Sequence, residues 1–250
     1  MRAILTYHSL DTSGSVISLE PSIFAGQMEW LARHSVRVVT IAELMRDSGD
    51  EDAVALTFDD AFQNFADYAA PVLARHGFPA TVFVVSDRVG TTNRWRSAGD
   101  RGIPELPLMD WNTLRDLAAT SGVTLGAHTR THPRLDRIGP SELADEVVGS
   151  ADSIRANTGC VSTDFAYPYG AITPDAVAAA RSAFRFACTT ELRMVRPNEH
   201  PLLLPRLDMY YFRREMSLDA WLAPGFPYRL GLRSFARRVR GGVLSLAGDS

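Results

Sequence analysis

Two adjacent carboxylates and two histidines form the part of this 250-residue chain best suited to chemistry. Asp59 and Asp60 follow an apolar run, 53–56, that predicts a short buried strand, and the residues after them predict a helix. Burying two neighbouring acids is costly unless a cation or a shared proton compensates. His128 and His132, which follow another predicted strand, are the best candidates to face these carboxylates.

Two histidines and one carboxylate suffice for a catalytic divalent-metal site, since zinc takes about three protein ligands and leaves a position for water. Consecutive side chains of an extended segment point in different directions. One aspartate can therefore bind the ion while the other faces the bound water. The ion lowers the pKa of that water toward ~7, and a neighbouring carboxylate can take its proton. This arrangement predicts a hydrolase.

Each half of this constellation also has a simpler interpretation. Adjacent aspartates before a helix often serve as an N-cap and a first-turn acid that the helix dipole favours. Histidines four positions apart occur by chance on protein surfaces. His8, at the end of the first predicted strand, is typical of a structural histidine. The combination of acids and histidines after two different strands favours the metal site over these alternatives.

The elements that position these residues alternate along the chain. Strands are predicted at 2–7, 37–39, 53–60, 80–85, 123–127, 186–188 and 203–210, and residues 165–170 are predicted to be a strand that runs into a tight turn. Helices are predicted at 24–32, 61–76, 111–118, 141–157 and 174–184. A further helix begins at the capping-box pattern of Thr40 and Glu43, and Gly77 is a plausible C-cap.

This alternation, without a linker, a repeat or a low-complexity segment, predicts a single α/β domain with a mainly parallel sheet or barrel. We expect the domain to span 1–225 and a basic tail to occupy 226–250. The carboxyl ends of parallel strands share one face, so polar side chains at those ends are expected to converge. They are His8, Asp59, Asp60, His128, His132, Tyr169 and, from the last strand, Arg206 and Asp208.

The composition restricts the class of protein. With 46% hydrophobic and 22% charged residues, the chain can bury a sizeable core. Its net charge of −3 argues against nucleic acid as a partner. Cys160 and Cys188 are interpreted as buried free thiols rather than a bridge. The N-terminus lacks the apolar stretch of a signal peptide and no run approaches a membrane span, so we expect a cytoplasmic location.

Two further segments have more than one interpretation. Residues 86–107 are aperiodic and rich in Gly, Arg and Asp, which indicates a long loop at the edge that carries the polar residues. Trp95 in that loop either stacks on a sugar or folds back on the core. The segment from Arg229 to Arg240 carries five arginines among apolar residues, typical of a solvated surface helix or of a weak contact with a membrane surface.

Together the motifs resemble those of the polysaccharide deacetylases of carbohydrate esterase family four. The family's Thr-Phe-Asp-Asp-Gly stands here as Thr-Phe-Asp-Asp-Ala at 57–61. Its His-Ser/Thr-x-x-His stands as His-Thr-Arg-Thr-His at 128–132, and a third motif is kept as Pro-Tyr-Gly at 168–170. Spacing and order match, and the resemblance spans residues 4–208.

The resemblance implies a deformed (β/α) barrel of about seven parallel strands that removes acetyl groups from N-acetylated sugars. It implies that Asp59 is the general base and that the backbone amide of Tyr169 donates to the tetrahedral oxyanion. Asp60, His128 and His132 would hold a divalent metal. Zinc is favoured for this set, although nickel, cobalt or iron can bind a similar one.

The chain departs from the family pattern at three points. Ala61 replaces the motif glycine, a mild change if the backbone there has a negative φ. The arginine expected near Ala166 to orient the base is missing, and Arg206 is the candidate to supply that charge. The C-terminal Leu-x-His that provides the general acid is absent, and His200 precedes its apolar run instead of following one.

His8 is therefore the better candidate for the acid. The Tyr-His pair near the N-terminus is similar to the circularly permuted branch, which includes biofilm poly-N-acetylglucosamine deacetylases and takes its acid histidine from the first strand. Protonating the leaving amine requires a group whose pKa is near neutral. We interpret the chain as a metal-dependent N-deacetylase of an acetamido sugar in an oligosaccharide, polysaccharide, glycolipid or precursor. The alternatives are an O-acetyl sugar esterase and a non-catalytic saccharide-binding protein on a deacetylase scaffold.

Overall fold

The computed structural model describes residues 2–46, 51–95, 102–119, 122–213, 218–222, 226 and 230–231. The strands are β1 (Arg2–Tyr7), β2 (Ser9–Leu10), β3 (Ser18–Leu19), β4 (Arg37–Val38), β5 (Ala53–Phe58), β6 (Ala80–Val84), β7 (Val123–Ala127), β8 (Asp164–Ala166), β9 (Phe186–Cys188) and β10 (Leu207–Asp208). The α-helices are α1 (Pro21–Arg33), α2 (Ile41–Arg46), α3 (Ala70–His76), α4 (Trp111–Ala119), α5 (Pro140–Thr158) and α6 (Pro174–Ala183). Most predicted elements are present within one or two residues of their predicted bounds.

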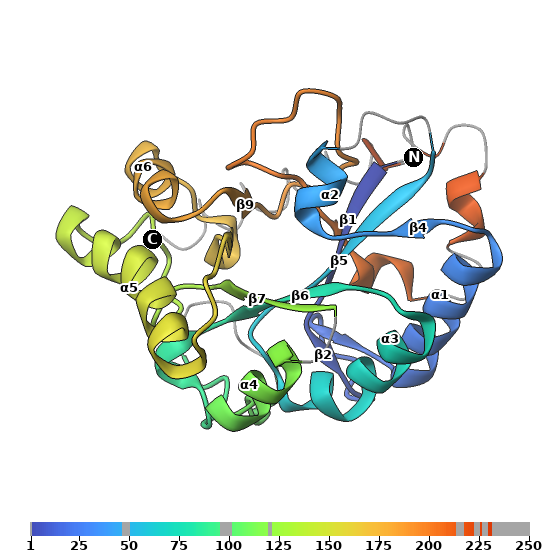
Figure 1. Cartoon of the computed structure of the whole chain (residues 1–250), viewed down its shortest axis with the longest axis horizontal. Coiled ribbons are helices and arrows are strands. Elements are labelled where there is room, and N and C mark those ends of the chain that lie inside the picture. The colour runs from blue at the N-terminus through green and yellow to red at the C-terminus, as the bar shows by residue number, and fades with distance from the viewer. Residues whose placement is uncertain are drawn as a thin grey trace.

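The main sheet is parallel throughout the described part of the chain. Its path runs β10-β1-β5-β6-β7-β8-β9, and β4 pairs with the first residues of β5 (Figure 1). The two ends of this path are close to each other. Leu207 of β10, at one end, pairs with Leu5 of β1, and Leu204, three residues earlier, bridges to Cys188 of β9 at the other end. The seven strands of the path therefore curl into a half-barrel, which confirms the predicted deformed (β/α) barrel.

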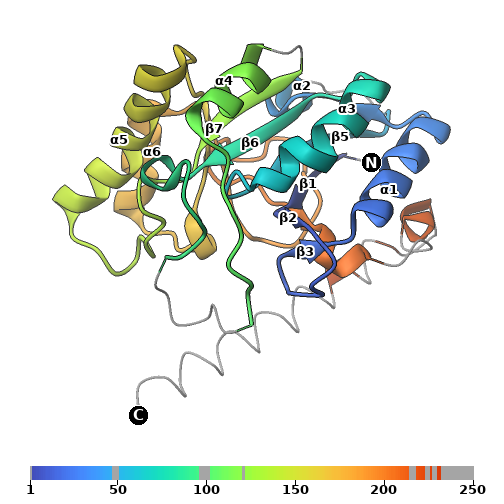
Figure 2. The same ribbon diagram turned by 90° about the horizontal axis from the view of Figure 1, so that it is seen from below.

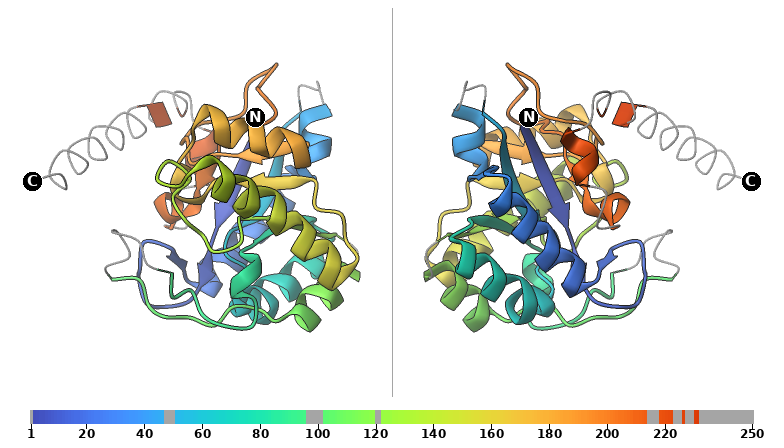
Figure 3. Two further views of the ribbon diagram at one scale, coloured as in Figure 1. Left: turned by 90° about the vertical axis from the view of Figure 1, so that its left-hand side faces the viewer. Right: turned by 90° about the vertical axis from the view of Figure 1, so that its right-hand side faces the viewer.

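The sheet is buried on both faces. Leu5 and Leu56 belong to a large apolar cluster shared with the helices, whereas Ile4 and Ala55 belong to a smaller cluster that Ile41 of α2 helps to close. Successive residues of a strand face opposite sides, so these two clusters occupy the two faces, as is usual for a parallel sheet. Figure 2 shows α1, α3, α4 and α5 arranged along the outer side of the strands, and α5 packs beside α6 (Figure 3).

Local sequence determines several helix ends, and the start of α2 and the end of α3 are as predicted. The amide of Thr40 donates to Glu43 Oε2 at 2.9 Å and the amide of Glu43 donates to Thr40 Oγ1 at 3.2 Å, so the capping box is present before α2. Gly77 ends α3 with a left-handed φ of 64°. Thr173 caps α6 by accepting the amide of Ala176.

The helix predicted to begin at residue 61 begins later. Asp60 and Ala61 have φ values of 72° and 58°, and this left-handed turn separates the end of β5 from the first helical residues. The chain then passes through a π-helical turn, η1 (Phe65–Ala69), into α3. Hydrophobic periodicity gave no indication of the turn because the residues around it are buried as well.

The last strand, predicted over 203–210, is reduced to β10. Pro205 has no amide hydrogen to donate to a neighbouring strand. Asp208 accepts the amide of Tyr210 at 3.0 Å, and this bond caps the 3-10 turn η4 (Met209–Phe212) that replaces the predicted strand end.

The remaining predictions concern the cysteines and the C-terminal region. Both cysteines are free; Cys188 is buried as predicted, whereas Cys160 is only half-buried. Phe226 and Leu230 pack in the large apolar cluster, while all five arginines of the basic segment from Arg229 to Arg240 lie outside the described residues. The division into 1–225 and 226–250 stays a prediction. Within the described residues, no helix combines the length and the apolar character needed to cross a membrane.

Candidate active site

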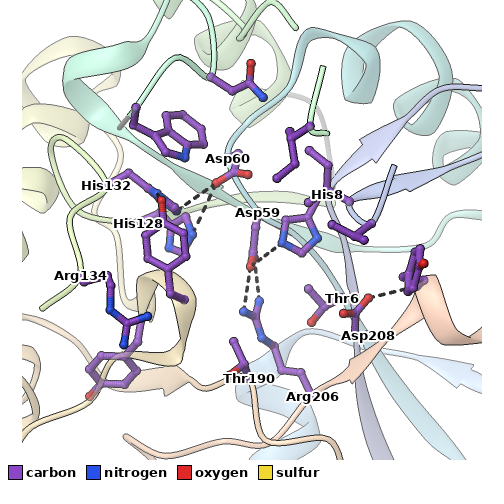
Figure 4. A pocket seen from close by; sticks show the side chains of 18 of the residues that line it. Thr6, His8, Asp59, Asp60, His128, His132, Arg134, Thr190, Arg206 and Asp208 are labelled. Carbon is purple, nitrogen blue, oxygen red and sulfur yellow. Dashed lines mark hydrogen bonds and ion pairs between the residues drawn. The ribbon is translucent and has the colours of Figure 1, made fainter. Parts of the chain in front are cut away.

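The carboxyl ends of the strands deliver the predicted residues to one pocket of about 710 Å³ (Figure 4). His8 follows β1, Asp59 and Asp60 follow β5, and His128 follows β7. The pocket brings together every site residue that the sequence predicts: His8, Asp59, Asp60, His128, His132, Tyr169 and Arg206. The convergence expected from parallel strands is therefore present.

Asp60, His128 and His132 are buried and point their ligand atoms at one another. Asp60 Oδ1 lies 3.6 Å from His128 Nε2 and 3.5 Å from His132 Nε2, and the three ligand atoms lie within 4.8 Å of one another. One carboxylate and two imidazoles are a donor set that zinc and similar divalent ions take, with room for water. The residues present therefore fit a catalytic divalent metal.

The two imidazoles are oriented through their other nitrogens. His128 Nδ1 donates to the carbonyl of Ala166 at 2.7 Å, so Nε2 carries the lone pair that faces Asp60. His132 Nδ1 lies 3.0 Å from the hydroxyl of Tyr169. Burial lowers the pKa of His128 to about 4 and that of His132 well below its ordinary value. Both rings are thus neutral near pH 7, the form that binds metal ions.

Asp59 has a different set of partners. It is 3% exposed and accepts two hydrogen bonds from Arg206, at 2.6 Å and 2.8 Å. Burial alone would raise its pKa, but the charge and hydrogen bonds of Arg206 hold the pKa well below its ordinary range. Asp59 is therefore a carboxylate that can accept a proton. The charge expected from the last strand is supplied by Arg206, which also donates to the carbonyl of Thr189.

His8 lies on the other side of Asp59 from the histidine pair (Figure 4). Its Nε2 is 3.6 Å from Asp59 Oδ2, and its side chain is 25% exposed. A histidine that touches the carboxylate and also meets the open pocket can exchange a proton with either. This position suits an acid that acts on a bound substrate.

Left-handed backbone is concentrated at the site. Among the described residues other than glycine, those with positive φ at the site are Asp60, Ala61, Thr129, His132 and Tyr169. The condition for a mild replacement of the motif glycine is not met, because Ala61 has a φ of 58°. The assumption of an extended Asp59–Asp60 segment is also wrong, since a left-handed turn separates the two carboxylates.

The turn at 168–170 depends on its glycine. Tyr169 has a φ of 58° and Gly170 a φ of 67°. A Cβ added at Gly170 would lie 2.1 Å from Thr190 Oγ1, so no larger residue fits without a shift.

The structure decides between the two interpretations of Trp95 and adds Glu146 to the sequence-based list. The ring of Trp95 lies 4.4 Å from the ring of His132 and lines the pocket, so it does not fold back on the core. Glu146 is a buried acid on α5 that contacts the loop between the two histidines. The sequence analysis did not identify Glu146, because a single acid on a helix carries no motif.

Comparison with known protein families identifies the family to which these motifs belong. The model of the family described as "Polysaccharide deacetylase" matches residues 46–184, more than half of the chain. The chain belongs to the polysaccharide deacetylase family. It is accordingly a deacetylase-type hydrolase acting on carbon–nitrogen bonds, as the motifs predicted. His8 and Arg206 lie outside the matched range, so their assignment rests on the geometry of the pocket.

Individual relatives agree with this placement. The chain is 26% identical over 212 residues to the poly-beta-1,6-N-acetyl-D-glucosamine N-deacetylase of Staphylococcus epidermidis, covering 79% of this chain and 70% of the relative. The structure of the Streptococcus pyogenes deacetylase PplD in complex with acetate matches with a TM-score of 0.75 and 20% identity, covering 89% of this chain and 98% of that one. IcaB from Ammonifex degensii matches with a TM-score of 0.74 and 24% identity, covering 88% and 95%. These two structures support the fold.

Proposed function

We propose that this protein is a metal-dependent N-deacetylase that removes acetyl groups from an acetamido sugar in an oligosaccharide, a polysaccharide, a glycolipid or a precursor. The observation that carries the proposal is that the two adjacent acids have different partners. Asp60 faces His128 and His132, while Asp59 faces Arg206 and His8. One acid thus belongs to a metal-binding set and the other is kept as an ionised base.

The proposed metal ligands are Asp60, His128 and His132, with zinc favoured and nickel, cobalt or iron as alternatives. When bound, the ion supplies a Lewis acid for the acetyl carbonyl and for the attacking water. Asp59 takes the proton from that water. Arg206 keeps Asp59 ionised and fixes its orientation through two hydrogen bonds.

The remaining steps use His8 and Tyr169. The backbone amide of Tyr169 donates to the tetrahedral oxyanion that forms when water adds to the acetyl carbon. The carbon–nitrogen bond then breaks, and His8 gives its proton to the departing amine, so that acetate and a free amine result. Because His8 Nε2 is 3.6 Å from Asp59, the proton gained by Asp59 can return to His8 and restore the starting state.

The substrate class is supported by the relatives and by the pocket. Several relatives bear the name poly-beta-1,6-N-acetyl-D-glucosamine N-deacetylase. Trp95, half-buried at the pocket wall, offers an aromatic face on which a sugar ring can stack. His8 as acid corresponds to the permuted branch of the family. The cytoplasmic location and the weak membrane contact of the segment from Arg229 to Arg240 stay predictions, to be checked by cell fractionation and vesicle sedimentation.

The proposal is tested by measuring acetate release from β-1,6-linked N-acetylglucosamine oligomers and from sugar O-acetates. The purified protein is assayed as isolated, after chelation, and after zinc is restored. We expect release from the amide substrates that chelation abolishes and zinc recovers. Release from esters alone would assign the protein as an O-acetyl esterase. Zinc binding without acetate from any substrate would favour a saccharide-binding protein, and the absence of metal binding would contradict the proposed site.

A further inference from the structure

The loop between the two proposed ligand histidines has a strained backbone. Thr129 and His132 have φ values of 66° and 67°, and a β-branched residue such as threonine rarely adopts this left-handed conformation. Strained backbone persists only where its surroundings determine it strongly. Within the loop, the hydroxyl of Thr129 accepts the amide of His132 at 3.0 Å. The restraint on the two residues between them comes from another element.

Glu146 of α5 supplies that restraint. Its Oε2 accepts two of the three backbone amides between the histidines, from Arg130 at 2.8 Å and from Thr131 at 2.9 Å. Its Oε1 accepts the hydroxyl of Thr131 at 2.6 Å. Glu146 is 6% exposed, and hydrogen bonds to a buried carboxylate are stronger than bonds between neutral groups. One side chain therefore fixes the amides of Arg130 and Thr131 in the inter-ligand loop.

The loop is held from its other side by the end of β6. The amide of Ser86 donates to the carbonyl of Thr129 at 3.1 Å, and the amide of Asp87 donates to the carbonyl of Arg130 at 2.9 Å. The ion pair between the Arg130 and Asp87 side chains is 34% exposed on both partners, and exposed pairs contribute little. The buried anchor of the loop on the helix side is thus Glu146.

The surface of α5 is shaped to receive this loop. Gly149, which follows Glu146 by three positions and so shares its face of the helix, lies beside the side chain of Arg130. A Cβ added at Gly149 would be 3.1 Å from Arg130 Cδ, which is closer than ordinary packing allows. The acceptor at 146 and the space at 149 together bring the loop against the helix.

We propose that Glu146 is a positioning residue that sets the separation of the Nε2 atoms of His128 and His132 and thereby the affinity for the metal. The inference rests on the proposed metal site. Removing the carboxylate releases the two amides of the loop, so the histidines lose their common orientation before the ion binds. Glu146 does not line the pocket, and its effect is therefore expected on metal affinity and not on KM for the sugar at saturating metal.

The experiment measures zinc affinity by competition with a chromophoric chelator, in wild-type protein and four variants. Glu146→Ala is expected to weaken zinc binding ~10–100-fold, the range found for residues that orient metal ligands. Glu146→Gln is expected to bind close to wild type, because its carbonyl oxygen can accept both amides and its NH2 can donate to Thr131. Asp152→Ala, which removes an exposed acid from the same helix, is the matched control and is expected to bind like wild type.

Thr131→Val removes only the hydroxyl bond and is expected to weaken zinc binding less than Glu146→Ala. It carries the test if Glu146→Ala does not fold, which circular dichroism would detect. Equal zinc affinity in wild type and in the folded Glu146→Ala and Thr131→Val proteins would overturn the inference. A rise of KM at saturating zinc that matches the loss of affinity would also overturn it. If wild-type protein itself bound no zinc, the proposed function would fail instead.

Discussion

Two buried aspartates at opposite edges of the same sheet have opposite electrostatic settings. Asp59 follows β5 at the carboxyl edge, and Asp164 begins β8 at the amino edge. Their exposed fractions are 3% and 5%. Arg206 holds the pKa of Asp59 well below its ordinary range despite burial, whereas burial raises the pKa of Asp164 to about 6 against the weaker opposing charge of Arg185. The two side chains are buried to a similar extent, so the charged partner decides whether the pKa is lowered or raised.

The surroundings of the two aspartates also differ in hydrogen bonding and in backbone conformation. Asp59 accepts two hydrogen bonds from a buried guanidinium, while Asp164 Oδ1 accepts none from the described residues. The carboxyl edge also carries most of the left-handed backbone found outside glycine in the described chain. Buried charge and left-handed backbone are therefore concentrated where chemistry is proposed.

The same substitution at the two aspartates should give the largest contrast. Asp59→Asn is expected to lower acetate release ~10²–10⁴-fold, because the amide cannot accept the proton of water, while bound zinc stays near wild type. Asp164 does not line the pocket, so Asp164→Asn is expected to keep wild-type turnover. Acetate assays with metal analysis of both variants check this. Full activity in Asp59→Asn would remove the base assignment.

Removing Arg206 should extend the comparison to the free energy of unfolding. Arg206→Met leaves Asp59 as a buried charge without its strongest partner, and is expected to lower the free energy of unfolding by ~3–5 kcal/mol. The control, Arg185→Met, removes an exposed arginine near Asp164 and is expected to change it by less than ~1 kcal/mol. Urea denaturation of both variants measures the difference. Similar losses in the two proteins would mean that the Asp59 pair contributes no more than a surface pair.

Asp164 should give a pH dependence of stability with a defined sign. Its pKa rises from an ordinary 3.8 in the unfolded chain to about 6 in the folded protein, so its favourable contribution is present below pH ~4 and is lost as pH rises through ~6. Asp164→Asn cannot ionise. Relative to wild type it is expected to gain ~1–3 kcal/mol at pH 7.5 and little at pH 4. Denaturation curves at several pH values test this, and a pH-independent difference would argue against a protonated Asp164.

The smallest effect concerns backbone strain. Ala61 and Ala55 are both 1% exposed, but only Ala61 has a left-handed φ. Both changes to glycine remove a buried methyl group and increase chain entropy in the unfolded state. Ala61→Gly also relieves about 1–2 kcal/mol of left-handed strain, so it is expected to cost at least ~1 kcal/mol less than Ala55→Gly. Equal losses measured by denaturation would show that the turn at Ala61 is not strained.

Much of the site could be predicted from the sequence because its residues sit in compact local motifs. Two acids after an apolar strand and two histidines after another define the donor set, and the alternation of strands and helices predicts that strand ends meet. The capping box at Thr40 and Glu43 likewise depends on residues three apart. Each of these features is decided within a few residues of chain.

Other features depended on contacts between distant segments. Arg206 was only a candidate until the curled sheet placed it against Asp59, 147 positions away in sequence. The left-handed turn at Ala61, the position of Trp95 in the pocket and the hydrogen bonds of Glu146 had no motif to predict them. The sequence by itself thus predicted which groups meet at the site. Only the tertiary structure decided how each is charged, oriented and held, because burial and partners are properties of the packed fold.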